Sequence, residues 1–170
     1  MVNNNMVTFA GNPVTLLGNE IKAGVKAPDF CVLGNDLKPV NLSDYKGKVI
    51  ILSIFPSVDT DVCSAQAHHF NKEASQLSDE IQILTLSNDL PFALGRYCDA
   101  EGINNLITLS DHRDLDFGLK YGFVIKELRL LTRGIVIVDK QGIVQHVEYV
   151  PEITQEPNYE ITLDVARKLV

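Results

Sequence analysis

The sequence predicts one α/β domain with a mixed β-sheet. The chain has 170 residues, of which 45% are hydrophobic and 22% charged, and this suits a single globular domain with a proper core. Apolar runs that could be buried on both faces alternate with helix-like segments, and this alternation favours parallel strand pairing. A hairpin pattern late in the chain adds an antiparallel edge. We therefore expect residues 1–170 to form one domain.

The strand pattern begins with an extra N-terminal β-hairpin in residues 1–18. Two short apolar stretches there flank the turn formers Gly11-Asn12-Pro13. Residues 26–48 are rich in turn formers, so loops and minor strands are expected. Three almost unbroken apolar runs then predict buried parallel strands: Val49–Phe55, Ile81–Ser87 and Leu106–Ser110.

Helices are predicted between these strands and at the end of the chain. An apolar stripe with spacings of three, four and three residues marks a helix in Val62–Leu77. Shorter helices are expected in Pro91–Cys98, where proline suits a first turn, and in Asp114–Gly122, where glycine ends the pattern. Gly134–Val150 reads as the late hairpin, and an amphipathic helix follows it. This order fits a thioredoxin-like fold, with helices flanking a mixed central sheet, better than a flavodoxin-like one.

Composition excludes several classes of function. The net charge is −7 and the pI about 5.0, whereas broad nucleic-acid binding needs a basic face. No apolar run approaches the ~18 residues of a membrane span, and the first residues lack the pattern of a signal peptide. We expect a cytoplasmic protein without nucleic-acid or membrane partners. Its three cysteines are too few for a secreted disulfide scaffold.

The segment "PSVDTDVC" (residues 56–63) is the candidate for chemistry. It places Cys63 just after the carboxyl end of a buried strand, where ligands bind in open α/β sheets. Thr60 is a good N-cap, so Cys63 falls in the first turn of a helix, whose free N–H groups favour a thiolate. Pro56 stiffens the exit from the strand. The same position would also suit a cysteine that only packs in the core.

A reactive Cys63 needs a nearby cation. An ordinary cysteine, with a pKa of ~8.5, is only a few per cent thiolate at neutral pH. A helix N-terminus typically supplies ~0.3–1 kcal/mol, whereas a cation at ~4 Å can supply up to ~4 kcal/mol at an effective dielectric constant of ~20. The candidate cations are Arg96, Arg113, Arg129, Arg133, Arg167, His68 and His69. Arg133 precedes an apolar strand and ranks slightly above Arg129.

The remaining cysteines and motifs narrow the chemistry. Cys31 lies in an apolar stretch and reads as a packing residue, whereas Cys98 could be a partner thiol or a surface residue. The sequence contains no C-x-x-C motif, no zinc-type spacing of cysteine and histidine, and no phosphate-binding glycine loop. Hydrolase and metalloprotease motifs are also absent.

These residues resemble a known family. The segment "PSVDTDVC" is similar to the P-x-x-x-T-x-x-C motif of peroxiredoxins. The similarity extends along nearly the whole chain to the thiol peroxidase branch, the Tpx type of atypical two-cysteine peroxiredoxin. The segments that carry it are "FAGNPVTL", "DLPFALGRYCDAEG", "NNLITLSDHR", "LLTRGIVIVDKQG" and "EITQEPNYE".

The resemblance implies a role for each candidate residue. Cys63 would be the peroxidatic cysteine, Thr60 would orient thiolate and peroxide, Pro56 would shield the pocket and Arg133 would be its cation. Cys98 would be the resolving cysteine, which forms an intramolecular disulfide with Cys63. The family reduces hydrogen peroxide and organic hydroperoxides, uses thioredoxin as external reductant and needs no metal or organic cofactor. The absence of tryptophan excludes the glutathione peroxidase arrangement.

Two further expectations follow. The resemblance implies a homodimer, with contacts expected around Pro56–Cys63, Phe92 and residues 116–123. A different class of function remains open, namely a redox-sensing binding protein that would use the same cysteines as a switch. An unreactive peroxiredoxin-like scaffold is a third reading. Sustained turnover of peroxide with thioredoxin would separate an enzyme from the switch, and alkylation of Cys63 below pH 7 would count against the unreactive scaffold.

Overall fold

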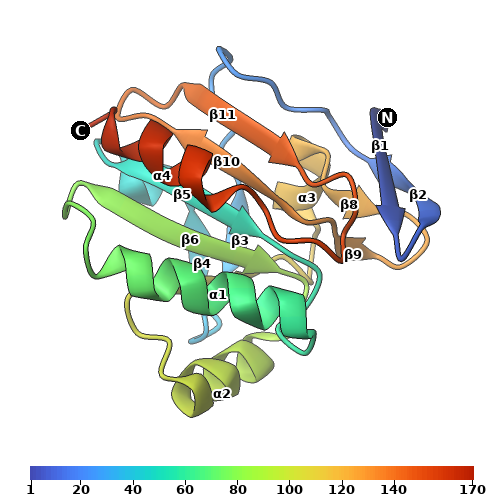
Figure 1. The fold of residues 1–170 in the computed structure, drawn as a ribbon, viewed down its shortest axis with the longest axis horizontal. Helices are drawn as coiled ribbons and strands as arrows, with labels where there is room; N and C mark the ends of the chain where they lie inside the picture. Colours follow the sequence, from blue (N-terminus) through green and yellow to red (C-terminus); the bar gives the residue numbers. More distant parts are fainter.

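A computed structural model describes residues 1–170 and shows two β-sheets (Figure 1). The larger sheet has seven strands, in the order β11 (Val144–Tyr149), β10 (Gly134–Val138), β5 (Val49–Ile54), β6 (Ile81–Ser87), β7 (Ile107–Ser110), β3 (Cys31–Leu33) and β4 (Pro39–Asn41). The smaller sheet has four, in the order β1 (Val2–Phe9), β2 (Asn12–Leu17), β8 (Val124–Ile125) and β9 (Leu130–Leu131). The helices are η1 (Leu42–Tyr45), α1 (Asp61–Ala74), α2 (Pro91–Glu101), α3 (Asp116–Tyr121) and α4 (Tyr159–Arg167).

The larger sheet confirms the predicted mixed α/β fold. β5, β6 and β7 pair in parallel, and the late hairpin adds β10 antiparallel to β5, with β11 at the edge. The strand predicted at Ile81–Ser87 is β6 itself, and the other two predictions are each one residue too long. The predicted thioredoxin-like layout with an extra N-terminal hairpin is thus observed (Figure 1).

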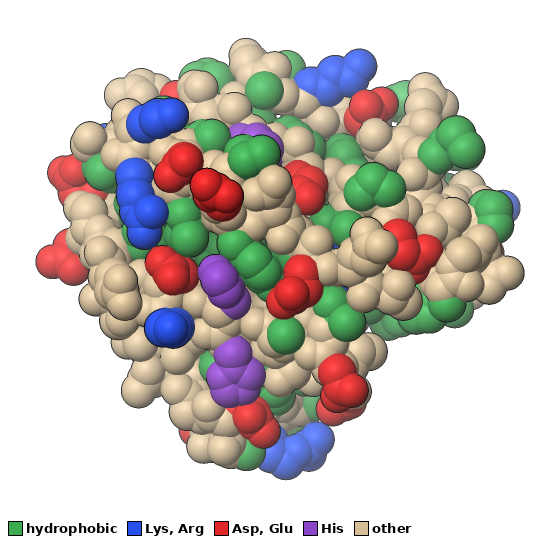
Figure 2. Space-filling view, in the orientation of Figure 1, with side chains coloured by type: hydrophobic (Ala, Val, Ile, Leu, Met, Phe, Trp, Pro, Cys, Tyr) green, Lys and Arg blue, Asp and Glu red, His purple; other side chains and the backbone are tan.

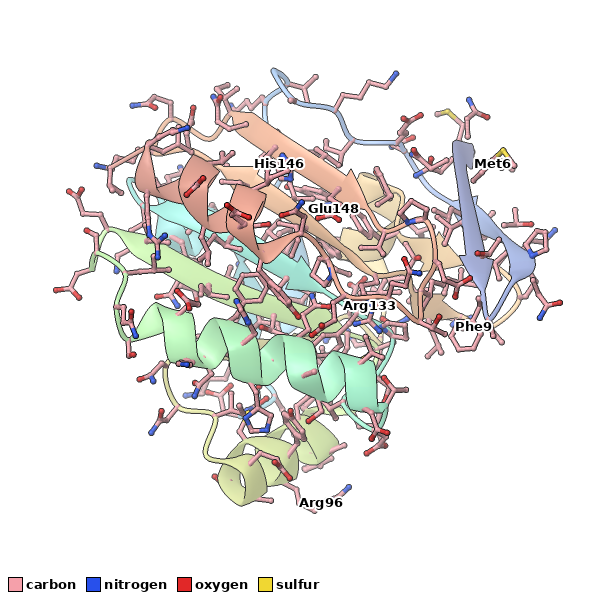
Figure 3. The ribbon with its side chains drawn as sticks, viewed as in Figure 1. Met6, Phe9, Arg96, Arg133, His146 and Glu148 are labelled. Carbon is pink, nitrogen blue, oxygen red and sulfur yellow. The ribbon has the colours of Figure 1, made fainter.

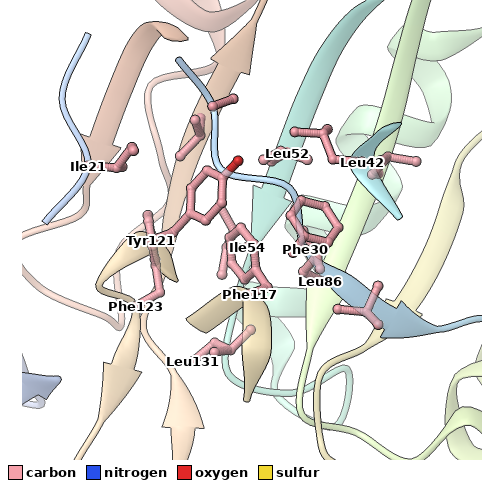
Figure 4. Packing of buried hydrophobic residues seen from close by; sticks show 14 of the residues in the cluster. Ile21, Phe30, Leu42, Leu52, Ile54, Leu86, Phe117, Tyr121, Phe123 and Leu131 are labelled. Carbon is pink, nitrogen blue, oxygen red and sulfur yellow. The ribbon is translucent and has the colours of Figure 1, made fainter. Parts of the chain in front are cut away.

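Alternate residues of β5 pack into two different cores. Ile50, Leu52 and Ile54 lie in a cluster with aromatic residues of α3 and the loops around it, which Figure 4 shows from close by. Val49 and Ile51 lie in a second cluster with residues of α1 and α4. The two-residue period of a strand produces this division, because successive side chains point to opposite faces. α1, α2 and α4 therefore cover one face, and α3 covers the other (Figure 1).

The smaller sheet ties the N-terminal hairpin to the rest of the chain. Its turn lies at Ala10 and Gly11, both with positive φ (49° and 80°), one residue before the predicted position. β2 then pairs with β8, which pairs with β9. β8 and β9 have only two residues each and were not predicted.

The helices agree with the sequence in position and differ at their ends. α1 begins one residue before the predicted start, with Thr60 as N-cap, and ends three residues early. α2 continues to Glu101 and ends at Gly102, which has left-handed backbone geometry. No helix in the chain has both the length and the apolar character that crossing a membrane requires.

Candidate active site

Cys63 lies fully buried in the first turn of α1, directly beyond the end of β5. The Thr60 hydroxyl caps this helix by accepting the Cys63 N–H at 3.3 Å. Phe55, Val58 and Leu94 pack in the same buried cluster as the cysteine. The predicted position of this cysteine, at the carboxyl edge of the sheet and at a helix start, is therefore observed.

Arg133 supplies the cation that a reactive Cys63 needs. It stands directly before β10, and its Nη2 donates to the Cys63 sulfur at 3.2 Å. Its Nη1 donates to Oε1 of Gln66 at 2.8 Å, and its Nε donates to the carbonyl of Ile153 at 2.8 Å. Only 1% of Arg133 is exposed, and Figure 3 shows it between α1 and the sheet. The guanidinium is thus held by three acceptors, of which one is the sulfur.

No carboxylate balances the charge of Arg133. None of the ion pairs in the structure includes it, and its two oxygen acceptors are neutral. A buried charge without a partner is costly, and a guanidinium cannot release its proton at neutral pH. Among the three acceptors only the sulfur of Cys63 can ionise. The buried positive charge of Arg133 therefore lies directly against the one acceptor that can carry a negative charge, the sulfur of Cys63.

The other candidate cations lie elsewhere. Arg113 and Arg167 form surface ion pairs with Asp114 and Glu73. Nε2 of His68 lies 3.0 Å from a carboxylate oxygen of Glu101. His69 stacks on Tyr159 with ring centroids 3.7 Å apart. Arg129 is exposed, and Arg96 extends into solvent from α2 (Figure 3). The sequence ranked Arg133 only slightly above Arg129 as the cation near Cys63. In the structure, Arg133 is the residue that contacts the sulfur.

Thr60 and Pro56 lie at the two ends of the loop before Cys63. Pro56 is buried directly after Phe55, where β5 has ended. The Thr60 hydroxyl donates to the Ser57 carbonyl at 3.2 Å, in addition to capping α1. Thr60 is exposed as a residue, whereas Cys63, whose N–H its hydroxyl accepts, is fully buried.

Asp89 anchors this loop and was missed by the sequence analysis. Its carboxylate accepts from the Ser57 hydroxyl at 2.7 Å, the Val58 N–H at 2.9 Å and the Ser87 hydroxyl at 2.8 Å. Asp89 follows β6, the parallel neighbour of β5, so the carboxyl ends of the two strands meet here. The adjacency of these two strand ends was the one signal in the sequence that could have identified Asp89. Gln66 was also missed, although it lies one helical turn after Cys63, and its amide donates to Ser53 Oγ at 2.8 Å.

Cys98 lies half-buried in the last turns of α2. Its sulfur is 3.4 Å from the Thr108 hydroxyl in β7, and no disulfide is present. Leu94, one turn earlier on α2, packs in the cluster around Cys63, whereas Cys98 packs against a different cluster. The two sulfurs are therefore separate in this reduced state, as expected from the sequence.

Two tyrosines near the site remain neutral. Burial raises the pKa of Tyr97, whose hydroxyl is 2.9 Å from Ser64 Oγ. Burial and a hydrogen bond to Glu156 raise the pKa of Tyr159 well above its ordinary value. Neither phenol therefore supplies a competing anion to Arg133 at neutral pH.

A thioredoxin-like sheet that holds a buried cysteine beside an arginine defines a thiol-based redox protein, and the redoxin family model matches residues 22–163. Thiol peroxidases of Oceanobacillus iheyensis and Bacillus subtilis are 54% and 52% identical, over 162 and 164 residues. The alignments cover 95% and 96% of this chain and 98% of each relative. The chain therefore belongs to the redoxin family and, within it, to the thiol peroxidases.

Solved structures agree with this assignment. A peroxiredoxin-like protein from Aquifex aeolicus superposes with a TM-score of 0.92 at 36% identity, over 99% of both chains. A thiol peroxidase from Chromobacterium violaceum has a TM-score of 0.86 over 98% of this chain and 97% of its own. At 16% identity, the second likeness supports the fold alone.

Proposed function

We propose that this chain is a thiol-dependent peroxidase that reduces hydrogen peroxide and organic hydroperoxides through Cys63. The observation that carries the proposal is the contact between the Cys63 sulfur and the buried Arg133, which has no carboxylate partner. A thiolate is the nucleophilic form of cysteine, and this environment favours it. The thiol peroxidase names of relatives above 50% identity support the same chemistry.

In the first step, the Cys63 thiolate attacks one oxygen of the peroxide. A sulfur–oxygen bond forms, the oxygen–oxygen bond breaks, and the leaving oxygen takes a proton to become water or an alcohol. Cys63 is then a sulfenic acid, oxidised by two electrons. Arg133 and backbone N–H groups of the α1 start stabilise charge on the peroxide oxygens, and Thr60 orients the peroxide. Pro56 shields the pocket from solvent.

In the second step, Cys98 resolves the sulfenic acid. Its thiolate attacks the Cys63 sulfur, an intramolecular disulfide forms, the sulfur–oxygen bond breaks, and the leaving hydroxide takes a proton to become water. The sulfurs lie in different clusters, so α2, the start of α1, or both must open locally. Cys31 takes no part in this cycle. A dithiol protein of the thioredoxin type then returns the two electrons by disulfide exchange.

The assembly and location proposed here go beyond the chemistry. Thioredoxin recycling implies a reducing compartment, so we propose a cytoplasmic enzyme. We also propose a homodimer. Of the expected contact residues, Phe92 is 69% exposed, but Phe117, Tyr121 and Phe123 are buried in the protein's own core. Segment 116–123 therefore offers a partner little more than Leu119, which is 42% exposed.

A coupled assay with thioredoxin, thioredoxin reductase and NADPH tests the proposal. Sustained NADPH oxidation is expected with hydrogen peroxide and with a bulky alkyl hydroperoxide, and its loss is expected in Cys63→Ser. Peptide mapping of the oxidised protein should find a Cys63–Cys98 disulfide within one chain. Cys98→Ser should instead accumulate sulfenic or sulfinic acid. Stoichiometric oxidation without turnover would favour the redox-sensing alternative, and a disulfide through Cys31 would overturn the assigned pairing.

A further inference from the structure

The Glu152 carboxylate joins the N-terminal hairpin to the loop that follows β11. Its Oε2 accepts from the Thr8 hydroxyl at 2.5 Å and the Gly11 N–H at 3.0 Å. Its Oε1 accepts from the Ala10 N–H at 2.9 Å and, within the loop, from the Thr154 hydroxyl at 2.8 Å. One side chain thus holds the hairpin turn and fixes its own loop.

The backbone next to Glu152 continues the same attachment. The Thr8 N–H donates to the Pro151 carbonyl at 2.8 Å, and the Ile153 N–H donates to the Thr8 carbonyl at 2.9 Å. The Ile153 side chain is 1% exposed and packs with Val7 and Leu16 of the hairpin. Both the main chain and the side chain of Ile153 are therefore held by the hairpin.

The carbonyl of this same Ile153 accepts the Arg133 Nε–H at 2.8 Å. Arg133 reaches the Cys63 sulfur through Nη2 of the same planar guanidinium. Because the guanidinium is rigid and planar, fixing Nε helps to fix the direction of Nη2. A shift of the Ile153 carbonyl would therefore tilt the donor that faces the sulfur. Figure 3 shows Arg133 on the side of the molecule where Phe9 and the hairpin tip lie.

We propose that Glu152 is a positioning residue for the reaction of Cys63, which it serves by clamping the hairpin to the Ile153 loop and so orienting Arg133. The proposal rests on the peroxidase function proposed above. It gives the hairpin, which lies apart from the catalytic residues, a role in the site. The acting groups are Glu152 and the Ile153 carbonyl on the loop after β11, and Thr8 with the Ala10–Gly11 turn on the hairpin.

The test compares two carboxylates that clamp the same hairpin. Glu127 accepts from the Thr15 N–H at 3.0 and 3.1 Å, but it lies in the β8–β9 turn and has no contact with the Ile153 loop. Glu152→Ala and its matched control Glu127→Ala are made in a background with Cys31→Ala and Cys98→Ser. Cys63 is then the one remaining thiol. The rate of Cys63 alkylation by iodoacetamide is measured as a function of pH. The rate of single-turnover oxidation by hydrogen peroxide is measured at neutral pH.

For Glu152→Ala we expect the alkylation profile to move to higher pH and oxidation to slow about five-fold, which corresponds to about 1 kcal/mol. Glu152→Gln, which keeps one acceptor oxygen, should give a smaller change in the same direction. Glu127→Ala should lower the melting temperature without changing the alkylation profile or the oxidation rate. Equal profiles for the two alanine variants would overturn the proposal. If the parent protein did not react with peroxide, the peroxidase function would fail, while the alkylation profiles would still test the positioning of Arg133.

Discussion

At the scale of single residues, Arg133 stands out because its charge has no partner of fixed opposite charge. Burying a guanidinium against neutral acceptors is unfavourable, and an anionic sulfur relieves that cost. A Coulomb interaction at ~4 Å and an effective dielectric constant of ~20 is worth up to ~4 kcal/mol. This exceeds the ~0.3–1 kcal/mol expected from the start of α1. We therefore expect the arginine to contribute more than the helix start to the reactivity proposed for Cys63.

Arg133→Met should slow the reaction of Cys63 with hydrogen peroxide by about ten-fold or more at neutral pH, because it removes at least ~1.4 kcal/mol of transition-state stabilisation. Single-turnover kinetics followed by sulfenic acid trapping measures the rate. Arg129→Met is the matched control, because Arg129 is exposed and this substitution removes an equal charge from the surface. An unchanged rate in Arg133→Met would contradict the assignment of Arg133 as the cation.

The sequence could predict those site residues that carry local signals. The eight-residue segment from Pro56 to Cys63 predicts a loop followed by a helix start. The placement of Pro56, Thr60 and Cys63 therefore needed no tertiary information. Gln66 and Asp89 could not be found this way. Each acts through hydrogen bonds to residues more than ten positions away, and only the folded chain reveals such partners.

At the scale of elements, α2 decides how Cys98 can reach Cys63. Side-chain contacts attach α2 to α1: Ser64 lies against Tyr97, and His68 is paired with Glu101 at 3.0 Å. Gly95 in the interior of α2 weakens the helix, since glycine costs ~1 kcal/mol relative to alanine in a helix interior. Because of this glycine, the helix that carries the proposed resolving cysteine is suited to local opening.

Gly95→Ala should slow disulfide formation and leave the first oxidation step unchanged. A Cβ at Gly95 would meet nothing within 4 Å, and its φ is not positive, so the substitution stabilises α2 without strain. A gain of about 0.5–1 kcal/mol corresponds to a two- to five-fold slower release of Cys98. Rapid-quench mass spectrometry separates sulfenic acid from disulfide. Faster or equal resolution in the variant would show that α2 does not open during this step.

The strands that the sequence could predict were those with long apolar patterns. Long apolar runs identified β5 and β6, because strands buried on both faces need such runs. β8 and β9 were not predicted, since two residues carry no periodicity. They form by pairing with each other, and β8 also pairs with β2 of the hairpin, which is a tertiary effect.

At the scale of the whole molecule, charges are dispersed, and a few of the exposed apolar residues lie near the site. Figure 2 shows acidic and basic side chains interspersed on one face, without a continuous basic patch. Leu90 and Phe92, at the start of α2, are 53% and 69% exposed. The Asn88 amide binds the Arg129 carbonyl at 2.8 Å and so brings the β8–β9 turn, with the exposed Leu128, to the same region. We propose these apolar side chains as the contact surface for a second copy.

Sedimentation velocity at micromolar concentration should show a homodimer, and Phe92→Asp should shift it toward monomer. A charge at the centre of an apolar contact must be desolvated on association, which opposes dimer formation. Leu37→Asp is the control, because Leu37 is 49% exposed in a different part of the surface. A monomeric parent protein, or a dimer unaffected by Phe92→Asp, would remove this surface as the interface.

The stability of the whole chain should depend on pH through Asp111. This carboxyl is 2% exposed at the end of β7 and accepts the N–H groups of Phe117 at 3.0 Å and Gly118 at 2.7 Å. Burial raises its pKa from 3.8 to about 6, against the opposing effect of these hydrogen bonds. The folded protein therefore holds this proton more tightly than the unfolded chain. Ionisation of Asp111 costs stability as the pH rises from about 4 to about 6.

Asp111→Asn removes this titration, so the free energy of unfolding of the parent, minus that of the variant, should fall across this range. The shift of about two pKa units corresponds to a fall of about 3 kcal/mol as an upper limit. Urea unfolding at several pH values and one fixed protein concentration measures the difference, in which the other carboxylates cancel. Asp114→Asn, at an exposed carboxylate paired only with Arg113, should give a difference that changes little with pH. A parent-minus-Asp111→Asn difference that stayed constant or rose would mean that Asp111 is ionised without cost, its charge stabilised by the amides at the start of α3.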